Sequence, residues 1–367
     1  MYTTIILYFA ILVMIRSSDM DFAYYNGSLY ASLYSQFEDR GDQTLYLMLQ
    51  ITQGSMTPLP NLIASMNNLK TDLRVDGTFN YWRPPGTNHP IFPDWDWLGW
   101  AASFIAPYPA IADEFIKQGP PWEQRSNNLF WTGTNLSAIR SSYIKCSQDH
   151  SERIKVSVVK REALLGTPPL PFLKPKHGIK KAVLDLRKLL GHRFLIYLPG
   201  STWSTSLKRI VAAGATVFKP LRPHYESITD IILKDCHNCF LYYNHDNLCS
   251  SLINILNKIT DVQAKGYAER LSRFVSVNFN ISRVREFALR ELIRYAASHP
   301  FPKNVIAKDD KLYFPSTNLT LDKVTCASIK KSHASHIGPD KTWQIDEWFD
   351  DECDLRSKLS YLSYVPI

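Results

Sequence analysis

The stretch RFLIYLPGSTWSTSLKRIVAAGATVFK, residues 193–219, contains the pattern that decides the fold. Its first six residues form a short apolar run typical of a buried strand, which Pro199 and Gly200 end. SLKRIVAA then has helical spacing, Gly214 is well placed as the helix C-cap, and ATVFK is typical of another strand. The stretch therefore predicts a strand–helix–strand unit with a right-handed crossover, as found in parallel α/β sheets.

The loop between this strand and this helix is rich in hydroxyl groups. It contains neither GxGxxG nor GxxxxGKS/T, so it has no standard phosphate-binding motif. Ligands of parallel α/β sheets nevertheless sit beyond the carboxyl ends of strands, where the free N–H groups of a helix N-terminus favour anions. Lys208 adds a full charge, and further donors come from four hydroxyl side chains: Ser201, Thr202, Ser204 and Thr205. We expect a phosphate or diphosphate site here; simple helix capping by one hydroxyl is the alternative.

Length and composition predict a folded chain of two domains. The 367 residues include 45% hydrophobic and 13% aromatic side chains, enough for a real core. The net charge of +8 is a mild excess, and Lys and Arg form no long basic run. We therefore expect no nucleic-acid partner, whereas a small anionic ligand fits this charge.

The N-terminus carries an unbroken apolar run, Ile5–Ile15. It is shorter than the about 20 residues of a membrane span and suits the apolar region of a signal peptide, with a buried strand or helix as the alternative. Four Asn-X-Ser/Thr sequons also favour the secretory pathway: Asn26, Asn135, Asn280 and Asn318. We expect residues 1–18 to be a signal peptide or a short membrane anchor. The protein would then reside in the endoplasmic reticulum or Golgi lumen, membrane-associated or secreted.

Six cysteines, an even number, permit disulfides in a secretory protein. Cys236-His237-Asn238-Cys239 has the form of half a zinc site. A structural zinc needs a second pair of ligands, and the nearest candidates, His245 and Cys249, lie at no familiar spacing. We expect disulfides or buried thiols, and no metal.

The Pro- and Gly-rich segment at residues 166–178 is the expected interdomain linker. An N-terminal domain would occupy residues 19–165, a C-terminal α/β domain residues 179–300, and an irregular extension residues 301–367. The second domain would end in two helices, at 264–279 and 282–298, which carry apolar residues at i, i+3, i+4 spacing. Ser282 is the expected cap of the second helix.

Several segments, taken in order, resemble the signature of glycosyltransferase family 90, which includes KDEL-type protein O-glucosyltransferases and fungal capsule-associated xylosyltransferases. The central match is WSTSLKRIVAAGATV followed by PHY. Its matching residues are Gly200, Trp203, Ser204, Lys208, Gly214, His224 and Tyr225. Upstream, three segments resemble family segments in order: PLPNLIASMNNLKTD (58–72), IFPDWDWLGW (91–100) and PWEQRSNNLFWTGTN (121–135). Arg140 matches an Arg that follows them, and the resemblance covers roughly residues 55 to 300.

This resemblance implies an α/β protein of the GT-B type, with two Rossmann-like domains and a cleft between them. The C-terminal domain would bind UDP-glucose or UDP-xylose, and the N-terminal domain would bind an acceptor, a glycan or glycoprotein hydroxyl. The family is inverting: a carboxylate takes the proton of the acceptor hydroxyl while UDP leaves from the opposite face. No metal or other cofactor is implied, because basic side chains and a helix N-terminus stabilise the diphosphate, and the UDP-sugar is a co-substrate.

The resemblance also implies a set of site residues. Those expected to bind the nucleotide-sugar are Arg140, Gly200, Ser204, Thr205, Ser206, Lys208 and His224. The family's catalytic Asp falls at Asn68, which cannot accept a proton, or at Asp72 in a shifted register. Thr132 and Ser206 stand where family members carry Arg, so neutralisation of the diphosphate falls on Lys208 and Arg140. A catalytically degenerate UDP- or glycan-binding protein of the same fold is therefore the alternative function.

Three further interpretations compete with this one. Asp94-Trp95-Asp96 is a DxD pattern, which holds Mn²⁺ in GT-A glycosyltransferases. Trp95, Trp97 and Trp100 would stack on sugars in a carbohydrate-binding module, or else fill a core or hinge. A serine hydrolase is disfavoured, because GSTWS lacks the GxSxG elbow.

Overall fold

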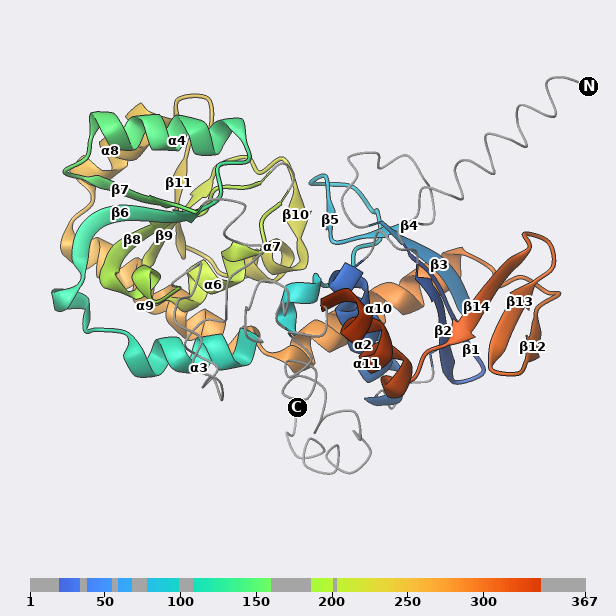
Figure 1. The fold of residues 1–367 in the computed structure, drawn as a ribbon. Coiled ribbons are helices and arrows are strands. Elements are labelled where there is room, and N and C mark those ends of the chain that lie inside the picture. The colour runs from blue at the N-terminus through green and yellow to red at the C-terminus, as the bar shows by residue number, and fades with distance from the viewer. Residues whose placement is uncertain are drawn as a thin grey trace, which may run out of the picture. The chain divides into compact units, whose positions relative to one another are not determined.

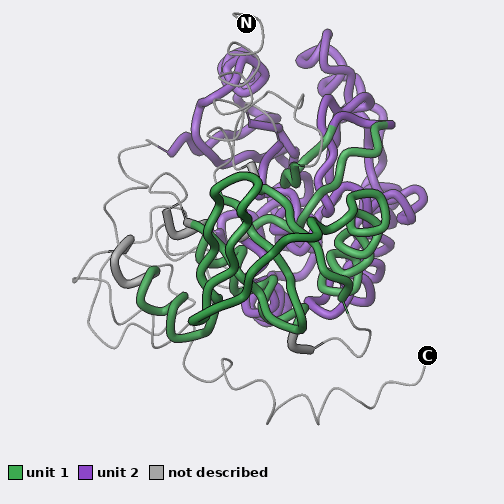
Figure 2. Tube along the Cα trace, turned by 90° about the vertical axis from the view of Figure 1, so that its right-hand side faces the viewer, with its two compact units in different colours: residues 1–83, 87–95, 284–367 green, residues 84–86, 96–283 purple. Residues whose placement is uncertain are grey.

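The chain divides into two units (Figure 2), each with its own sheet. Unit 1 contains residues 1–83, 87–95 and 284–367, and unit 2 contains residues 84–86 and 96–283. The computed structural model describes residues 20–33, 38–54, 59–67, 78–98, 108–159, 186–200 and 203–337.

Unit 2 is built on a five-stranded sheet in which each strand is parallel to its neighbours. The strands, in spatial order, are β11 (Phe240–Tyr243), β9 (Thr216–Pro220), β8 (His192–Ile196), β6 (Ser126–Gly133) and β7 (Ile154–Val158). Along the chain, β7 is added on one side of β6, whereas β8, β9 and β11 are added on the other. The strand order therefore reverses between β6 and β8, as in doubly wound α/β sheets.

Helices cover both faces of this sheet (Figure 1). On one face lie α4 (Ala138–Asp149) and α8 (Leu248–Lys258), and on the other lie α6 (Ser206–Ala212) and α9 (Asp261–Asn278), with α3 (Tyr108–Gln118) against α6. Every residue of β9 is buried, as expected of a strand covered on both faces. Shorter elements complete the unit: η3 (Trp122–Gln124), η4 (Leu186–Gly191), β10 (Glu226–Ser227) and α7 (Ile228–Leu233).

The strand–helix–strand unit predicted from residues 193–219 is confirmed as β8, α6 and β9, with β8 and β9 paired in parallel. Gly214 has a φ of +65°, the left-handed conformation of a helix C-cap. The two predicted helices at 264–279 and 282–298 correspond to α9 and α10 (Ile281–Ser298). The cap of α10 is Asn280 instead of Ser282, because Asn280 Oδ1 accepts the backbone N–H of Arg283 at 2.9 Å.

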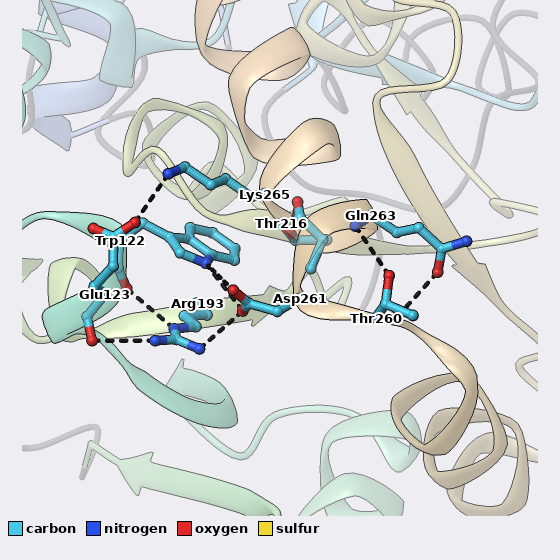
Figure 3. A network of polar contacts seen from close by, with 9 residues as sticks. Trp122, Glu123, Arg193, Thr216, Thr260, Asp261, Gln263 and Lys265 are labelled. Atoms are coloured by element: carbon cyan, nitrogen blue, oxygen red, sulfur yellow. Dashed lines mark hydrogen bonds and ion pairs between the residues drawn. The ribbon is translucent and has the colours of Figure 1, made fainter.

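Hydrogen bonds of charged side chains fasten α9 to the amino-terminal edge of the parallel sheet (Figure 3). Arg193, at the start of β8, donates to the backbone oxygens of Trp122 and Glu123 and to the Asp261 carboxylate, at 2.8 Å. The Trp122 indole N–H also donates to Asp261, at 3.1 Å. Thr260 caps the first turn of α9, so this end of the helix is held from two sides.

Unit 1 contains a seven-stranded mixed sheet. The strands, in spatial order, are β12 (Ile306–Lys308), β13 (Lys311–Phe314), β14 (Leu319–Lys323), β2 (Ser28–Leu33), β1 (Met20–Tyr25), β3 (Leu62–Asn67) and β4 (Thr78–Asn80). Only β3 and β4 pair in parallel among the described strands of this sheet. The other elements are α2 (Glu38–Gly54), α11 (Cys326–Ile337), β5 (Trp82–Arg83), most of α10, and the first residue of η1 (Trp95–Trp97). Tyr295 of α10 packs its ring 4.9 Å from that of Phe79, which holds the helix on the sheet.

The predicted mixed α/β class is confirmed, but only unit 2 has a Rossmann-like parallel sheet. The irregular extension expected at residues 301–367 is wrong for its described part, residues 301–337, which contains three strands and a helix. β14 pairs with β2, so the end of the chain completes the sheet that its beginning starts. The linker expected at residues 166–178 lies outside the described residues, yet β7 before it and β8 after it share one sheet.

Disulfides are present, as expected. Cys146 of α4 is bonded to Cys249 of α8, on one face of the parallel sheet, and Cys236 is bonded to Cys239. The second bond overturns the half zinc site, because both thiols of that motif are consumed. The expected signal peptide or anchor at residues 1–18 lies outside the described part of the chain, whose helices include none long and apolar enough to cross a membrane.

Candidate functional site

The candidate site lies at the carboxyl edge of the parallel sheet, where the strand order reverses between β6 and β8. The loop after β6 leads to α4 on one face, and the loop after β8 leads to α6 on the other. Neighbouring loops that part in this way leave a crevice, the common ligand position in such sheets. The two loops are joined by a hydrogen bond from Ser137 Oγ to Pro199 O, at 3.2 Å.

Arg140 places a buried positive charge beneath this junction. It lies in the first turn of α4, and its side chain donates to Thr134 O at 2.9 Å and to Leu198 O at 3.1 Å, one carbonyl from each loop. Burial lowers the pKa of the guanidinium. Within the described residues no carboxylate pairs with Arg140, so its charge meets only carbonyl and hydroxyl dipoles and an aromatic ring. The Trp131 ring lies 5.5 Å from the guanidinium carbon and adds a cation–π contact.

The loop after β8 is held in a tight conformation by its own groups. A Cβ on Gly200 would lie 3.0 Å from Trp203 O and 3.7 Å from Arg140 Nη2, so the close approach of the backbone needs glycine. The backbone N–H of Ser204 donates to the Tyr197 hydroxyl at 3.1 Å. Together these contacts hold the loop beside the Arg140 guanidinium.

The hydroxyl groups of this loop bind one another and the helix that follows. Ser204 Oγ lies 2.9 Å from Ser206 Oγ and accepts the Ser206 N–H at 3.4 Å. Thr205 Oγ1 accepts a hydrogen bond from Arg209 at 3.3 Å. Thr205 is the N-cap residue of α6, but its side chain accepts no backbone N–H of the helix. Ser201 and Thr202 lie outside the described residues. The described hydroxyls therefore gather at the start of α6, where they were expected.

Lys208 does not present its amine to solvent, contrary to the expected diphosphate contact. Its side chain is 1% exposed, and Nζ lies 3.3 Å from the Asp96 carboxylate, which also accepts from Arg209. The amine lies 5.4 Å from the centre of the Trp97 ring as well. The Lys208 amine is therefore part of a buried ion pair and does not contribute its charge to the loop after β8.

The same cluster answers two competing interpretations of the DWDW segment. Asp96 is fully buried and bound by Lys208 and Arg209, so its carboxylate is not presented to a metal. Trp97 is fully buried too, with its ring 5.1 Å from that of Tyr108 and 5.7 Å from that of Phe279. Trp97 therefore fills a core and cannot stack on a sugar. The side chain of Trp95 and the whole of Trp100 lie outside the described part of the chain.

Two histidines meet at the same edge of the sheet, beyond β9 and β11. His224 is exposed, and its ring lies 5.3 Å from the ring of His245, which sequence reasoning considered only as a zinc ligand. Lys219 at the end of β9 pairs with the buried Asp230, at 2.9 Å. Asp230 also accepts from the N–H and hydroxyl of Ser227 and caps α7. His224 and His245 share one sequence signal, because each follows an apolar strand pattern within a few residues.

The expected catalytic positions, Asn68 and Asp72, lie outside the described residues. The preceding strand, β3, is present and ends at Asn67. Thr132, which stands where family members carry Arg, lies in β6 and donates to Ser157 O of β7 at 3.1 Å. Its side chain therefore supports the sheet.

We predict that Asp96→Asn strongly destabilises the fold. The change leaves Lys208 and Arg209 buried without their shared carboxylate, which costs about 3–5 kcal/mol of unfolding free energy. Urea denaturation followed by circular dichroism measures this loss. Glu123→Gln is the matched control, because the Glu123–Lys265 pair is exposed to solvent and its loss should change stability little. Equal stability of the two variants would contradict the structural role given to Asp96.

Comparison with protein families matches residues 58–317, more than two thirds of the chain, to Glycosyl transferase family 90. No match was found among curated proteins. The matched range includes the whole parallel sheet and both loops of the switch point. The chain therefore belongs to glycosyl transferase family 90, a membership that implies glycosyltransferase activity in general.

Proposed function

We propose that this chain moves glucose or xylose from a UDP-sugar to a hydroxyl group of a protein or glycan, with inversion and without a metal. The proposal rests on the family and on one observation: the buried Arg140 guanidinium at the switch point, which no described carboxylate neutralises. A diphosphate would supply the missing negative charge. The arrangement of the two units as a GT-B fold belongs to the same proposal.

Two further features of the switch point favour an anion. The first N–H groups of α4 receive no cap from the Ser137 side chain, whose hydroxyl donates to Pro199 O. Free N–H groups at the start of a helix of 12 residues attract negative charge. Gly200 keeps the neighbouring backbone close to Arg140, where a larger residue would meet Trp203 O.

In the proposed reaction the acceptor oxygen attacks C1 of the sugar as the bond from C1 to the UDP oxygen breaks. UDP departs with the electron pair of that bond, and the acceptor proton passes to a base, for which Asp72 is the candidate. Arg140 stabilises the departing diphosphate by its charge, while hydroxyls of Ser204, Thr205 and Ser206 bind its oxygens. His224 lies at the edge of the same crevice. Lys208 contributes by holding Asp96 and the inner face of α6 in place.

A second function rests on Asn68, which stands where the family carries its catalytic Asp. An amide accepts no proton at neutral pH, so a chain that relies on this position would bind UDP or a glycan without transfer. Substitutions at Asp72 and Asn68 distinguish sugar transfer from binding without transfer. If Asp72 is the base, Asp72→Asn abolishes turnover; if the site is degenerate, Asn68→Asp creates it.

The proposed location is the secretory pathway, as a membrane-associated or a secreted protein. Two described disulfides fit an oxidising compartment. Asn26, Asn135, Asn280 and Asn318, the acceptors of the four sequons, are all exposed. A glycan on any of them would therefore meet solvent.

We predict that Arg140→Gln weakens UDP binding about tenfold, because the amide keeps hydrogen-bond donors but loses the charge. Calorimetric titration of UDP measures the affinity, and Arg140→Lys should recover part of it. Arg153→Gln is the matched control. Arg153 also donates to a carbonyl, Leu256 O, but precedes β7 at the amino-terminal edge of the sheet. Equal UDP affinity in Arg140→Gln and the native chain would exclude the proposed diphosphate position.

We predict UDP release from one of UDP-glucose and UDP-xylose when the chain is offered protein and glycan acceptors. Release should continue in EDTA, since the charge of the diphosphate is met by protein groups, and should stop in Asp72→Asn while UDP still binds. Loss of release in EDTA would contradict metal independence. Binding of UDP without release, together with release by Asn68→Asp, would establish the degenerate alternative.

A further inference from the structure

A second cavity lies at the opposite, amino-terminal edge of the parallel sheet. Its volume is about 450 Å³, and it is bounded by α3, by α9 and by the turn between α6 and β9. All its lining residues belong to unit 2. Gly214 and Arg125 mark the edge, because one precedes β9 and the other precedes β6. The cavity is therefore separated from the candidate sugar-nucleotide site by the length of the strands.

The walls of this cavity are mainly apolar. Buried aromatic and aliphatic side chains from three helices line it: Phe115, Val211, Val275 and Phe279. Ile116 of α3 also lines the cavity and is 75% exposed, so it adds an apolar side chain at the cavity's open side. The size and lining are those of sites that take small, mostly apolar molecules.

One positive charge stands among these walls. Arg125 Nη1 donates to Ala213 O at 3.0 Å and to Gly214 O at 2.6 Å, and Nε donates to Pro120 O at 3.0 Å. Burial lowers the pKa of its guanidinium. Among the described residues, no carboxylate forms an ion pair with Arg125, and its Nη2 donates no hydrogen bond. Three carbonyls thus accept hydrogen bonds from Nε and Nη1 of Arg125, and Nη2 donates none to the described residues.

Two glycines leave that nitrogen open. A Cβ on Gly119 or on Gly214 would lie 3.4 Å from Arg125 Nη2, and both glycines line the cavity. Gly214 needs a left-handed φ of +65° for the turn, and a Cβ on Gly119 would lie 2.8 Å from the backbone oxygen of Phe115, so the local backbone requires glycine at both positions. The absence of side chains at both positions keeps space beside the guanidinium.

We propose that this cavity binds a small apolar carboxylate, with its carboxylate on Arg125 Nη2 and its apolar body between α3 and α9. A single negative charge fits better than a phosphate, because among the described residues the only other charged side chain lining the cavity is the Asp113 carboxylate. Ser272 and Ser276 of α9 supply hydroxyls near the charged end. The site does not depend on the proposed sugar transfer, since it lies at the other edge of the sheet.

Octanoate is the probe for this site, with 1-octanol as its uncharged control, and calorimetric titration of the full chain as the measurement. We expect saturable binding of octanoate. The affinity for 1-octanol should be at least tenfold lower, because the alcohol lacks the charged contact. Octanoate should bind equally well in the presence of UDP. Absence of saturable octanoate binding, or equal binding of the two molecules, would overturn the proposal.

Four variants separate binding from folding. Arg125→Gln should weaken octanoate binding about tenfold, and Arg125→Lys should retain most of it. Asp113→Asn should strengthen it about twofold, because a like charge is removed from an exposed position. Ala112→Phe should abolish it by filling the cavity. Circular dichroism verifies that each variant is folded, and unchanged binding in folded Ala112→Phe would place octanoate elsewhere and overturn the proposal.

Discussion

Burial of both faces of the parallel sheet is the constraint on which the rest of unit 2 depends. Parallel strands need crossover connections, and each crossover places a helix on a face. Because β7 and β9 lie on opposite sides of the neighbouring strands β6 and β8, the crossover through α4 and the crossover through α6 cover different faces, and the loops after β6 and β8 separate at the carboxyl edge. The candidate site is thus a consequence of strand order. Arg140, Gly200 and the hydroxyls before α6 lie there because they belong to the segments that follow β6 and β8.

Buried cations are the second recurring feature of this unit, and they fall into two kinds. Lys208 and Arg209 share the Asp96 carboxylate, so their charges are met inside the protein. Arg140 and Arg125 are held mainly by main-chain carbonyls and by no carboxylate among their described contacts. Burying a charge is costly unless it is paired, and carbonyl dipoles offset only part of that cost. The two unpaired guanidinium groups, one at each edge of the sheet, are therefore where we propose anionic ligands.

Local signals made part of this structure predictable. The strand β8, the helix α6 and the C-cap at Gly214 follow from an apolar run, a helical spacing and a glycine within 27 residues. Family motifs placed Arg140 and the hydroxyl loop together before their contacts were known. What could not be predicted depends on distant parts of the chain. Arg209 meets Asp96 across 113 residues, so the Asp of the competing DxD interpretation forms an ion pair instead. Asp322 likewise pairs with Ala31 in a sheet that no local pattern indicated.

The most direct test of the central claim is hydrogen–deuterium exchange of the full chain with and without UDP. The account predicts protection by UDP in peptides covering residues 134–140 and 197–206, the two loops at the carboxyl edge. Peptides covering Arg125 and Gly214, at the amino-terminal edge, should exchange at unchanged rates. Protection confined to the amino-terminal edge, or a bound state that leaves both carboxyl-edge loops unprotected, would contradict the placement of the diphosphate at the switch point.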